Sequence, residues 1–487
     1  MIKKLLPFVL FFGIISTILF SCKKDDFETS GNVQLSFSED TVMFDTVFTS
    51  VGSATEVFTV YNNEDKAIKI SSLRLANGQA SDFRLNVDGM PGKSFTDVEI
   101  GANDSIFIFV EVTVDPNNQN TPLVITDSII FETNGNVQDL DLVAWGQDAY
   151  YHRWTQLPDS ISLPYPFFTL DCNDVWNNDK PHVIYGYAIV DSLCTLTINQ
   201  GTKVHLHAGA AMIVYTSASL FVNGTIQEPV IIQGDRLHQD FQDVPGQWDR
   251  IWLYPGSKNS YIRNAIIKNG NVGLQVDTVA GPGDSTLYLE NTIIKTMSSN
   301  ALLLQGSKVS AYNCVFANCG GSVLNILYGG NYKFYQSTFA NFWDNGTRQD
   351  PVIFMNNYYT AVRPLNSYFG NCIVYGNNDQ EIGLDSIALS NQFNFYFDNA
   401  LLKVENAFST TSPFHYNGIV RATSNFNSPG FKDIGNNIYE LDSVNSSALD
   451  KGTMSVVNAF PSVLNFDIKG IARPQRALPD LGSYERE

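Results

Sequence analysis

The tetrapeptide Asn291-Thr292-Ile293-Ile294 decides the fold, because its pattern recurs along the second half of the chain. Each copy begins with an amide residue, continues with a small residue and ends with an apolar residue, and the copies start 27, 22, 23 and 35 residues apart. Short β-rich repeats of about 20 to 30 residues predict a solenoid whose coils stack on one another. The other copies are Asn264-Ala265-Ile266-Ile267, Asn313-Cys314-Val315-Phe316, Gln336-Ser337-Thr338-Phe339 and Asn371-Cys372-Ile373-Val374.

The columns of this alignment indicate which residues face the core. The residue two before the amide is apolar, the residue after it is small, and the residue three after it is apolar. The inward phase therefore slips by one residue at the amide, which predicts a tight bend there; asparagine tolerates the left-handed conformation that such a bend needs. The three columns are Ile262, Leu289, Ala311, Phe334 and Phe369; Ala265, Thr292, Cys314, Ser337 and Cys372; and Ile267, Ile294, Phe316, Phe339 and Val374.

Stacked coils would bring these amides into one column, in which they satisfy one another and the backbone of the bends. The pattern resembles the asparagine ladder of β-helices with the pectin-lyase-like fold, and the resemblance implies a right-handed parallel β-helix over residues 190–487. The segment Asp467–Glu485 resembles the closing segment of bacterial surface β-helices. The expected structural ladder consists of Asn264, Asn291, Asn313, Gln336 and Asn371.

The residues before this domain are also expected to form strands. Within residues 33–148, runs such as Val57-Phe58-Thr59-Val60-Tyr61 alternate apolar and polar residues between turn signals, which predicts an antiparallel β-sandwich. The order of these runs resembles immunoglobulin-like domains of the abnormal-spindle and Hydin type, which implies a spacer or a protein-binding module. Residues 149–189 contain Pro158, Pro164 and Pro166 and are expected to be a connector that caps the helix. The predicted fold class is therefore all-β.

The N-terminus carries the pattern of an exported lipoprotein. Lys3 and Lys4 precede an apolar run that ends at Phe20, too short for the roughly 20 residues of a membrane-spanning helix. Leu19-Phe20-Ser21-Cys22 resembles a lipobox, which implies a signal peptide over residues 1–21, lipidation of Cys22 and a tether over residues 22–32. The following Lys23-Lys24-Asp25-Asp26 resembles a sorting tag, so we expect an outer-membrane protein exposed at the cell surface.

The net charge restricts the class of binding partner, and the cysteine positions suggest which thiols are paired. The formal net charge is −19, and without Lys3 and Lys4 it becomes −21, so phosphate backbones would be repelled and no nucleic-acid partner is expected. Of the six cysteines, Cys172 and Cys194 are a plausible pair in an oxidising compartment. The column alignment instead makes Cys314 and Cys372 small core residues.

Two groups of residues are candidate contact sites. An insertion between coils gathers carboxylates, an imidazole and a guanidinium, which could form a site or be only a solvated loop. Tyr358 and Tyr359 are candidates for ligand contact, and Trp248, Trp252 and the run Phe414-His415-Tyr416 are further potential stacking platforms, although Trp252 is expected to pack on the helix wall. The insertion residues are Asp235, Arg236, His238, Asp240 and Asp243.

The sequence lacks the usual catalytic signatures of this fold. Within the helix there is no Asp-Asp pair and no Gly-His-Gly, and no catalytic residue is predicted. We therefore expect a non-enzymatic surface lipoprotein, attached to the membrane through its lipid, that presents the β-helix to a glycan or a surface protein. The alternatives are a polysaccharide-active enzyme, a lyase or glycoside hydrolase with atypical residues, and a structural envelope component. No metal site or cofactor is predicted, although a lyase would use carboxylate-bound Ca²⁺.

Overall fold

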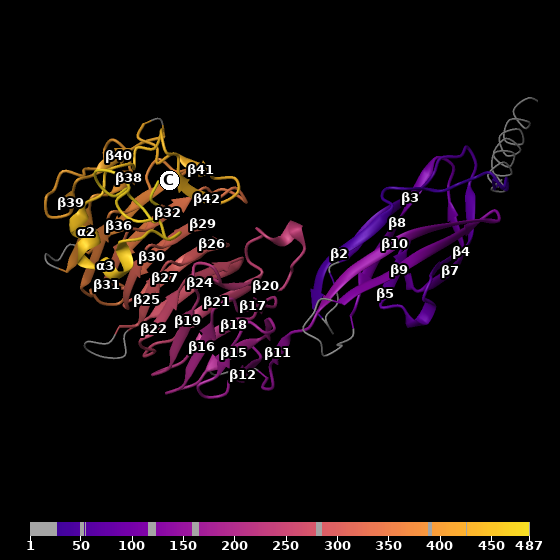
Figure 1. The fold of residues 1–487 in the computed structure, drawn as a ribbon, viewed down its shortest axis with the longest axis horizontal. Helices are drawn as coiled ribbons and strands as arrows, with labels where there is room; N and C mark the ends of the chain where they lie inside the picture. Colours follow the sequence, from indigo (N-terminus) through magenta and orange to yellow (C-terminus); the bar gives the residue numbers. More distant parts are fainter. Residues whose placement is uncertain are drawn as a thin grey trace, which may run out of the picture. The chain divides into compact units, whose positions relative to one another are not determined.

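The computed structural model describes residues 27–48, 53, 55–114, 123–157, 165–278, 285–387, 392–424 and 426–486. The chain divides after Asp148 into two compact units, and strands dominate both (Figure 1). The predicted all-β fold is therefore confirmed. The expected signal peptide, residues 1–21, and the expected lipidation residue Cys22 lie outside the described residues. Among the residues that are described, no helix has the length and apolarity needed to cross a bilayer.

The first unit is the predicted β-sandwich. Its strands alternate buried and more exposed residues, as β5 (Phe83–Val87) does. The buried residues of its two sheets form one apolar core between them. The core begins before β1, at Val33, and Glu28 N donates to Ala67 O, so part of the expected tether belongs to the sandwich. The sheets are β1 (Ser36–Phe37), β3 (Glu56–Asn62), β8 (Asp104–Val112), β5 (Phe83–Val87) and β6 (Met90–Gly92); and β2 (Thr41–Phe48), β10 (Asn136–Gln147), β9 (Leu123–Thr133), β4 (Ile68–Leu75) and β7 (Ser94–Ile100), with the turn η2 (Gly78–Ala80).

The second unit is a parallel β-helix. Consecutive strands enter three parallel sheets in turn, named here sheets I, II and III, and each strand pairs with its equivalent in the next coil. One continuous apolar core runs between the sheets.

Sheet I contains β11 (Tyr150–Arg153), β14 (His182–Tyr185), β17 (Lys203–Leu206), β20 (Val230–Gly234), β23 (Ala265–Lys268), β26 (Ile293–Met297), β29 (Val315–Cys319), β32 (Thr338–Asn341), β35 (Ile373–Gly376), β38 (Leu401–Lys403) and β40 (Val420–Ala422). Sheet II contains β12 (Phe167–Thr169), β15 (Tyr187–Val190), β18 (Ala211–Val214), β21 (Trp248–Leu253), β24 (Gly270–Asp277), β27 (Asn300–Gln305), β30 (Leu324–Leu327), β33 (Ile353–Asn356) and β36 (Ile382–Asp385). Sheet III contains β13 (Val175–Trp176), β16 (Thr195–Asn199), β19 (Ser219–Asn223), β22 (Ser260–Arg263), β25 (Leu287–Glu290), β28 (Lys308–Tyr312), β31 (Gly330–Tyr335), β34 (Leu365–Gly370), β37 (Phe393–Asp398) and β39 (Tyr416–Asn417).

The amide residues of the repeat stand at the bend between sheets III and I. All five have positive φ, between 46° and 52°, and the residues before them are in register from coil to coil. The amides do not bond to one another, however, which corrects the expected ladder. All but Asn291 donate to backbone carbonyl groups instead: Asn264 Nδ2 donates to Gly224 O, for example, and Gln336 Nε2 donates to Asp480 O. For Asn313, Gln336 and Asn371 the acceptor carbonyl groups belong to residues near the C-terminus, which lie against this column. The acceptor for Asn264 lies in the preceding coil instead.

An amide ladder does occur on the outer face of sheet III. Asn366 Nδ2 donates to Asn331 Oδ1 at 3.1 Å, and Asn394 Nδ2 donates to Asn366 Oδ1 at 3.2 Å. The three residues are paired in register on β31, β34 and β37. Extended strands, rather than the bends, therefore bring successive amides within hydrogen-bonding reach.

The interpretation of residues 149–189 as a connector was wrong. They form β11 to β15, and β11 already pairs in parallel with β14. Proline removes only a donor, and its carbonyl still accepts: Tyr150 N donates to Pro181 O at 2.8 Å, and Tyr187 N donates to Pro166 O at 2.9 Å. The helix therefore begins at Tyr150.

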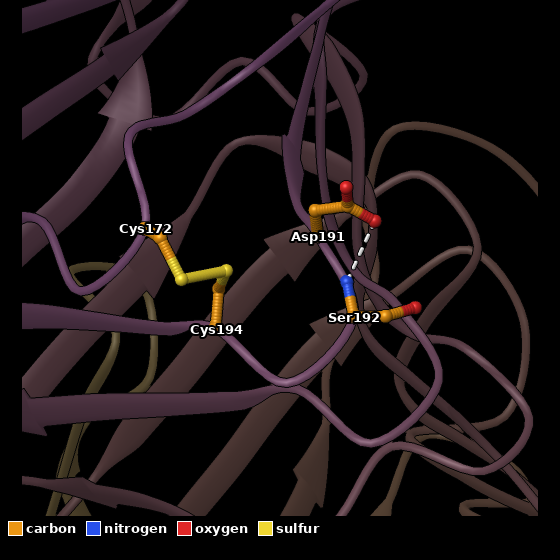
Figure 2. The surroundings of a disulfide bond; sticks show 4 residues. All are labelled: Cys172, Asp191, Ser192 and Cys194. Atoms are coloured by element: carbon orange, nitrogen blue, oxygen red, sulfur yellow. Dashed lines mark hydrogen bonds between the residues drawn. A yellow bond between two sulfur atoms is a disulfide. The ribbon is translucent and has the colours of Figure 1, made fainter.

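The expected Cys172–Cys194 pair is a disulfide in the structure (Figure 2). Cys172 lies between β12 and β13, and Cys194 lies one coil later, between β15 and β16. In the same turn as Cys194, Asp191 Oδ1 accepts a hydrogen bond from Ser192 N at 2.6 Å. The bridge thus joins the first two coils at the turn between sheets II and III.

Alkylation of the folded protein is expected to leave Cys314, Cys319 and Cys372 unmodified. All three are free and fully buried, and burial raises each thiol pKa to about 12. Cys314 and Cys372 lie two coils apart, because Ser337 stands between them in register; that is roughly 9–10 Å, beyond the approximately 7 Å limit for a disulfide. Denaturation without reductant should expose all three to iodoacetamide, and a peptide map that joined Cys314 to Cys372 would contradict the register.

The C-terminal segment, residues 446–486, runs lengthwise along the column of bends. Thr453 N donates to Asn371 Oδ1, Asn313 Nδ2 donates to Phe466 O, and Ser483 N donates to Thr338 Oγ1. Apolar residues of its extended parts and of the preceding hairpin pack on the outer side of sheet I. The apolar residues of its two short helices pack instead on tyrosines of sheet III. The chain therefore covers much of one face of its own helix. The elements concerned are β41 (Phe431–Asp433), β42 (Ile438–Leu441), α2 (Met454–Ala459) and α3 (Pro461–Leu464).

Candidate functional site: the outer face of sheet II

Sheet II presents a cluster of aromatic residues on its outer face. Ile213 pairs with Trp252 in register, and Trp252 pairs with Gln275, so these side chains form one outward row across successive coils. Tyr215 is 40% exposed and its ring stacks on Tyr254 at 4.8 Å between centroids; Tyr254 in turn lies 5.0 Å from Trp252. The rings pack outside the core, so they are available at the surface and held in place by one another.

Polar side chains beside these rings form a continuous network. Trp252 Nε1 donates to Asp277 Oδ2 at 2.8 Å, and Gln275 Nε2 donates to the same oxygen at 3.1 Å. Arg250 Nη1 donates to Gln275 Oε1 at 2.5 Å, and its Nε donates to Asp249 Oδ1 at 3.0 Å. We call these five residues the Trp252 network. Because each polar group already has a partner, the network has a fixed geometry.

Burial determines the electrostatics of this network. Asp277 is only 6% exposed, and burial raises its pKa, although hydrogen bonds from Trp252 and Gln275 and the charge of Arg250 act in the opposite direction. Tyr187 O–H donates to Asp249 Oδ2 at 2.7 Å, and burial followed by that bond raises the pKa of Tyr187. The face thus holds one carboxyl group that favours protonation more than an ordinary aspartate does.

Tyr358 and Tyr359 follow β33 at the far end of the same sheet. Tyr358 O–H donates to Asp385 Oδ2 at 2.5 Å, whereas Tyr359 is 75% exposed and its ring lies 5.2 Å from that of Tyr328. Trp252 and Asn356 stand in neighbouring rows four coils apart, which is about 19 Å at the usual strand spacing. Aromatic groups therefore stand at two separated places on sheet II.

The other potential platforms do not join this face. Trp248 is fully buried, and its Nε1 donates to Lys268 O, because its position on β21 points into the core. His415 is partly buried and its ring stacks on Phe395 at 4.2 Å, and Tyr416 is buried, so Phe414 is the one fully exposed ring of that run. The expectation that Trp252 only packs on the helix wall was incomplete, since Trp252 packs there and also reaches the surface network.

The polar loop that the sequence singled out does not converge on one centre. Asp235 Oδ2 lies 2.6 Å from His207 Nδ1, and this contact raises the pKa of His207. Arg236 stands over the ring of Phe241 at 4.4 Å, and His238 caps the short helix η3 (Gln239–Phe241). Asp240 and Asp243 face a different region, a groove that they line together with residues from later coils. Three of the five residues therefore hold the loop in shape.

Metal binding finds no support in the side-chain arrangement. Over the described ranges, no group of three or more His, Cys, Asp or Glu residues is placed to hold a metal ion. The carboxylates of the Trp252 network already accept hydrogen bonds from Trp252, Arg250 and Gln275. The arrangement is suited to holding polar, uncharged groups of a ligand beside aromatic rings, rather than to coordinating a cation.

Sequence reasoning missed Arg250, Gln275 and Asp277. They belong to sheet II, whereas the aligned columns describe only the bend between sheets III and I. A register shift between Arg250 and Ile251 also breaks the alternation of β21 against β24. The available signal was the alternation in β24, where the polar residues Asn271, Gln275 and Asp277 alternate with the apolar residues Val272, Leu274 and Val276.

No family model and no curated protein sequence matches this chain. Similar solved structures include a family 123 glycoside hydrolase from Clostridium perfringens, at 8% identity over 23% of this chain and 26% of that chain, with a TM-score of 0.17. A PapD-like domain of human CEP192 shares 8% identity over 23% of this chain and 84% of that domain, with a TM-score of 0.16. The catalytic unit of a family 87 α-1,3-glucanase from Streptomyces thermodiastaticus shares 9% identity over 71% of this chain and 73% of that chain, with a TM-score of 0.26. These values assign no function.

Proposed function

We propose that this chain is a surface lipoprotein that binds a polysaccharide along the outer face of sheet II. The observation that supports the proposal is the Trp252 network, in which partly exposed rings stand beside polar groups of fixed orientation. Aromatic faces bind the apolar faces of sugar rings, and a few oriented polar groups select hydroxyl positions. A long polysaccharide bound at these rings would continue along sheet II toward Tyr358 and Tyr359.

The same proposal includes attachment and location. Lipidation at Cys22 would anchor the protein, the residues after it would direct it to the outer membrane, and the β-sandwich would act as a spacer or protein-binding module. The acidic net charge favours a neutral glycan or a basic protein surface over nucleic acid. Much of sheet I is covered by the chain's own C-terminal segment, which favours sheet II as the face presented to a ligand.

A second candidate function is hydrolysis of the bound polysaccharide. It is favoured by the raised pKa of Asp277 in a network that also contains the carboxylate of Asp249. In glycoside hydrolases one carboxyl group donates a proton to the leaving oxygen while a second one acts as base or nucleophile. Asp277 would be the acid and Asp249 the second carboxylate.

The test is a glycan array with neutral and acidic polysaccharides, followed by titration of the best ligand against variants. Trp252→Ala should weaken binding by about tenfold or more, because a central aromatic contact commonly contributes that much. Tyr288→Ala is the matched control, since Tyr288 is 39% exposed on sheet III. Equal affinity for the two variants, or an array without any ligand, would contradict the proposal.

The same preparations distinguish binding from hydrolysis. Reducing ends released by the wild-type protein and lost in Asp277→Asn, with binding retained, would establish the second candidate. Binding without release of reducing ends in either protein would exclude it.

A further inference from the structure

A groove of about 490 Å³ lies beside sheet I, away from the Trp252 network. The insertion after β20 forms one side of it, the turn after β32 forms another, and the hairpin of β41 and β42 completes it. A volume of this size is in the range of small-ligand sites. Its lining is Asp240, Asp243, Val244, Thr296, Asn318, Phe342, Trp343, Asp344, Asn345, Asn377, Ile434, Gly435 and Asn437.

The walls of the groove are held by hydrogen bonds. Asn269 Nδ2 donates to Gln242 O at 3.0 Å and to Val244 O at 2.9 Å, which fixes the insertion against β24. Across the groove, Asn318 Nδ2 donates to Asn437 Oδ1, and Asn318 Oδ1 accepts from Phe342 N at 2.9 Å. Three chain segments far apart in sequence are thus joined around the same space. The groove is therefore preformed.

One buried hydroxyl group of the lining has no partner. Thr296 is only 4% exposed, and its Oγ1 makes no hydrogen bond in the described structure. A buried polar group without a partner is unfavourable, and such groups in native proteins call for an explanation. Because Thr296 lines the groove, a hydroxyl or amine of a bound molecule would supply the missing partner.

The charge of the lining is negative. It contains three carboxylates, from Asp240, Asp243 and Asp344, and no lysine, arginine or histidine is among the lining residues given above. Lys268 and Lys295 stand in register on sheet I near Asp243, and burial lowers the pKa of both. Both interact with the charge of Asp243, although neither belongs to the lining, which leaves Asp240 and Asp344 as its other two carboxylates. A groove with walls of one sign concentrates ions of the opposite sign.

An aromatic ring accompanies these carboxylates. Trp343 is partly exposed, and its ring packs so closely over Gly320 that a Cβ atom there would lie 3.2 Å from Trp343 Cζ2. Tryptophan is the aromatic residue that best attracts a cation to its face. The same ring offers an apolar surface to a sugar.

We propose that this groove binds a sugar that carries a primary amine, with the sugar ring against Trp343, the ammonium group beside a carboxylate of the acidic lining and a polar group on Thr296 Oγ1. The amides of Asn345 and Asn377 lie in reach of the remaining hydroxyls as part of the same lining. This second site is independent of the Trp252 network, so either can fail without the other.

The experiment compares a tetramer of β-1,4-linked glucosamine with its fully N-acetylated form by calorimetry at pH 6. The amine form should bind about tenfold or more tightly, and raised salt should weaken its binding, because the attraction is largely electrostatic. Asp344→Asn and Asp243→Asn should each weaken binding of the amine form severalfold. Both residues are exposed, so the variants should fold normally. Thr296→Val, which keeps the shape and removes the hydroxyl, should also weaken it.

The control variant is Tyr288→Ala, which lies on sheet III outside both proposed sites and should leave this affinity unchanged. Equal affinity for the amine and acetylated tetramers, or groove variants that bind like the wild-type protein, would overturn the proposal. The variant Trp343→Phe and the sugar-free amine N-acetyl-lysine amide test whether the groove recognises a sugar ring. If the lysine derivative binds as tightly as the glucosamine tetramer, the groove recognises a protein side chain instead, and the sugar assignment is wrong.

Discussion

Replacing Arg473 with alanine is expected to lower the free energy of unfolding by about 3–5 kcal/mol, the usual effect of removing one partner of a buried ion pair. The Arg473 side chain is fully buried, and its Nε lies 3.4 Å from Glu485 Oε2. Its Nη1 donates to Asn313 Oδ1 at 2.7 Å, and its Nη2 donates to Ser483 O at 3.0 Å. The variant would leave an uncompensated carboxylate and several unpaired acceptors between the helix and its C-terminal segment.

Equilibrium denaturation in urea measures this effect. Arg476→Ala is the matched control, because Arg476 is exposed three residues later. Asn313→Leu removes the partner amide and should cost about 1–3 kcal/mol. The double variant Arg473→Ala with Asn313→Leu should then be less destabilised than the sum of the two single variants. An Arg473→Ala protein as stable as the Arg476→Ala protein would show that the C-terminal segment is not docked as described.

Replacing Cys22 with serine is expected to release the protein from membranes almost completely. Acyl chains contribute about 0.8 kcal/mol per buried methylene, far more than an acidic surface could contribute to binding anionic lipid. The measurement is the distribution of the protein between membrane pellet and supernatant after fractionation, together with incorporation of labelled fatty acid. Cys314→Ser is the control, since it also changes one cysteine and should remain in the pellet. A Cys22→Ser protein that still sediments with membranes would contradict lipidation as the anchor.

The sequence predicted the bends of the helix because a one-residue slip in the alternation of inward-facing residues indicates a tight bend between two strands. It also predicted the buried state of Cys314 and Cys372, since both belong to a column of small residues. The same columns could not predict what the amides bind. Asn313 and Phe466 are 153 residues apart, and no local pattern reports a contact over that distance.

The first coils and the candidate site were missed for different reasons. β13 consists of only Val175 and Trp176, and so short a strand has no measurable alternation. The Trp252 network combines residues of β21 and β24, whose relative register depends on a bulge that the sequence does not mark. The polar loop was a candidate site because of its composition alone. In the structure its residues stabilise the loop or line a separate groove.

Because of the C-terminal segment, the stability of this β-helix does not grow simply with each coil that is added. In a simple solenoid each coil contacts only its neighbours, so stability grows step by step as coils are added. Here residues 446–486 contact the bends at Asn313, Gln336, Asn371 and Asn399, and thereby connect four coils at once. These residues follow every coil that they hold together, so they are synthesised only after those coils. A protein truncated before residue 446 would keep nearly all of its strands but lack the segment that holds the coils together. We therefore expect premature termination to give a protein that is prone to proteolysis, and not a shorter functional one.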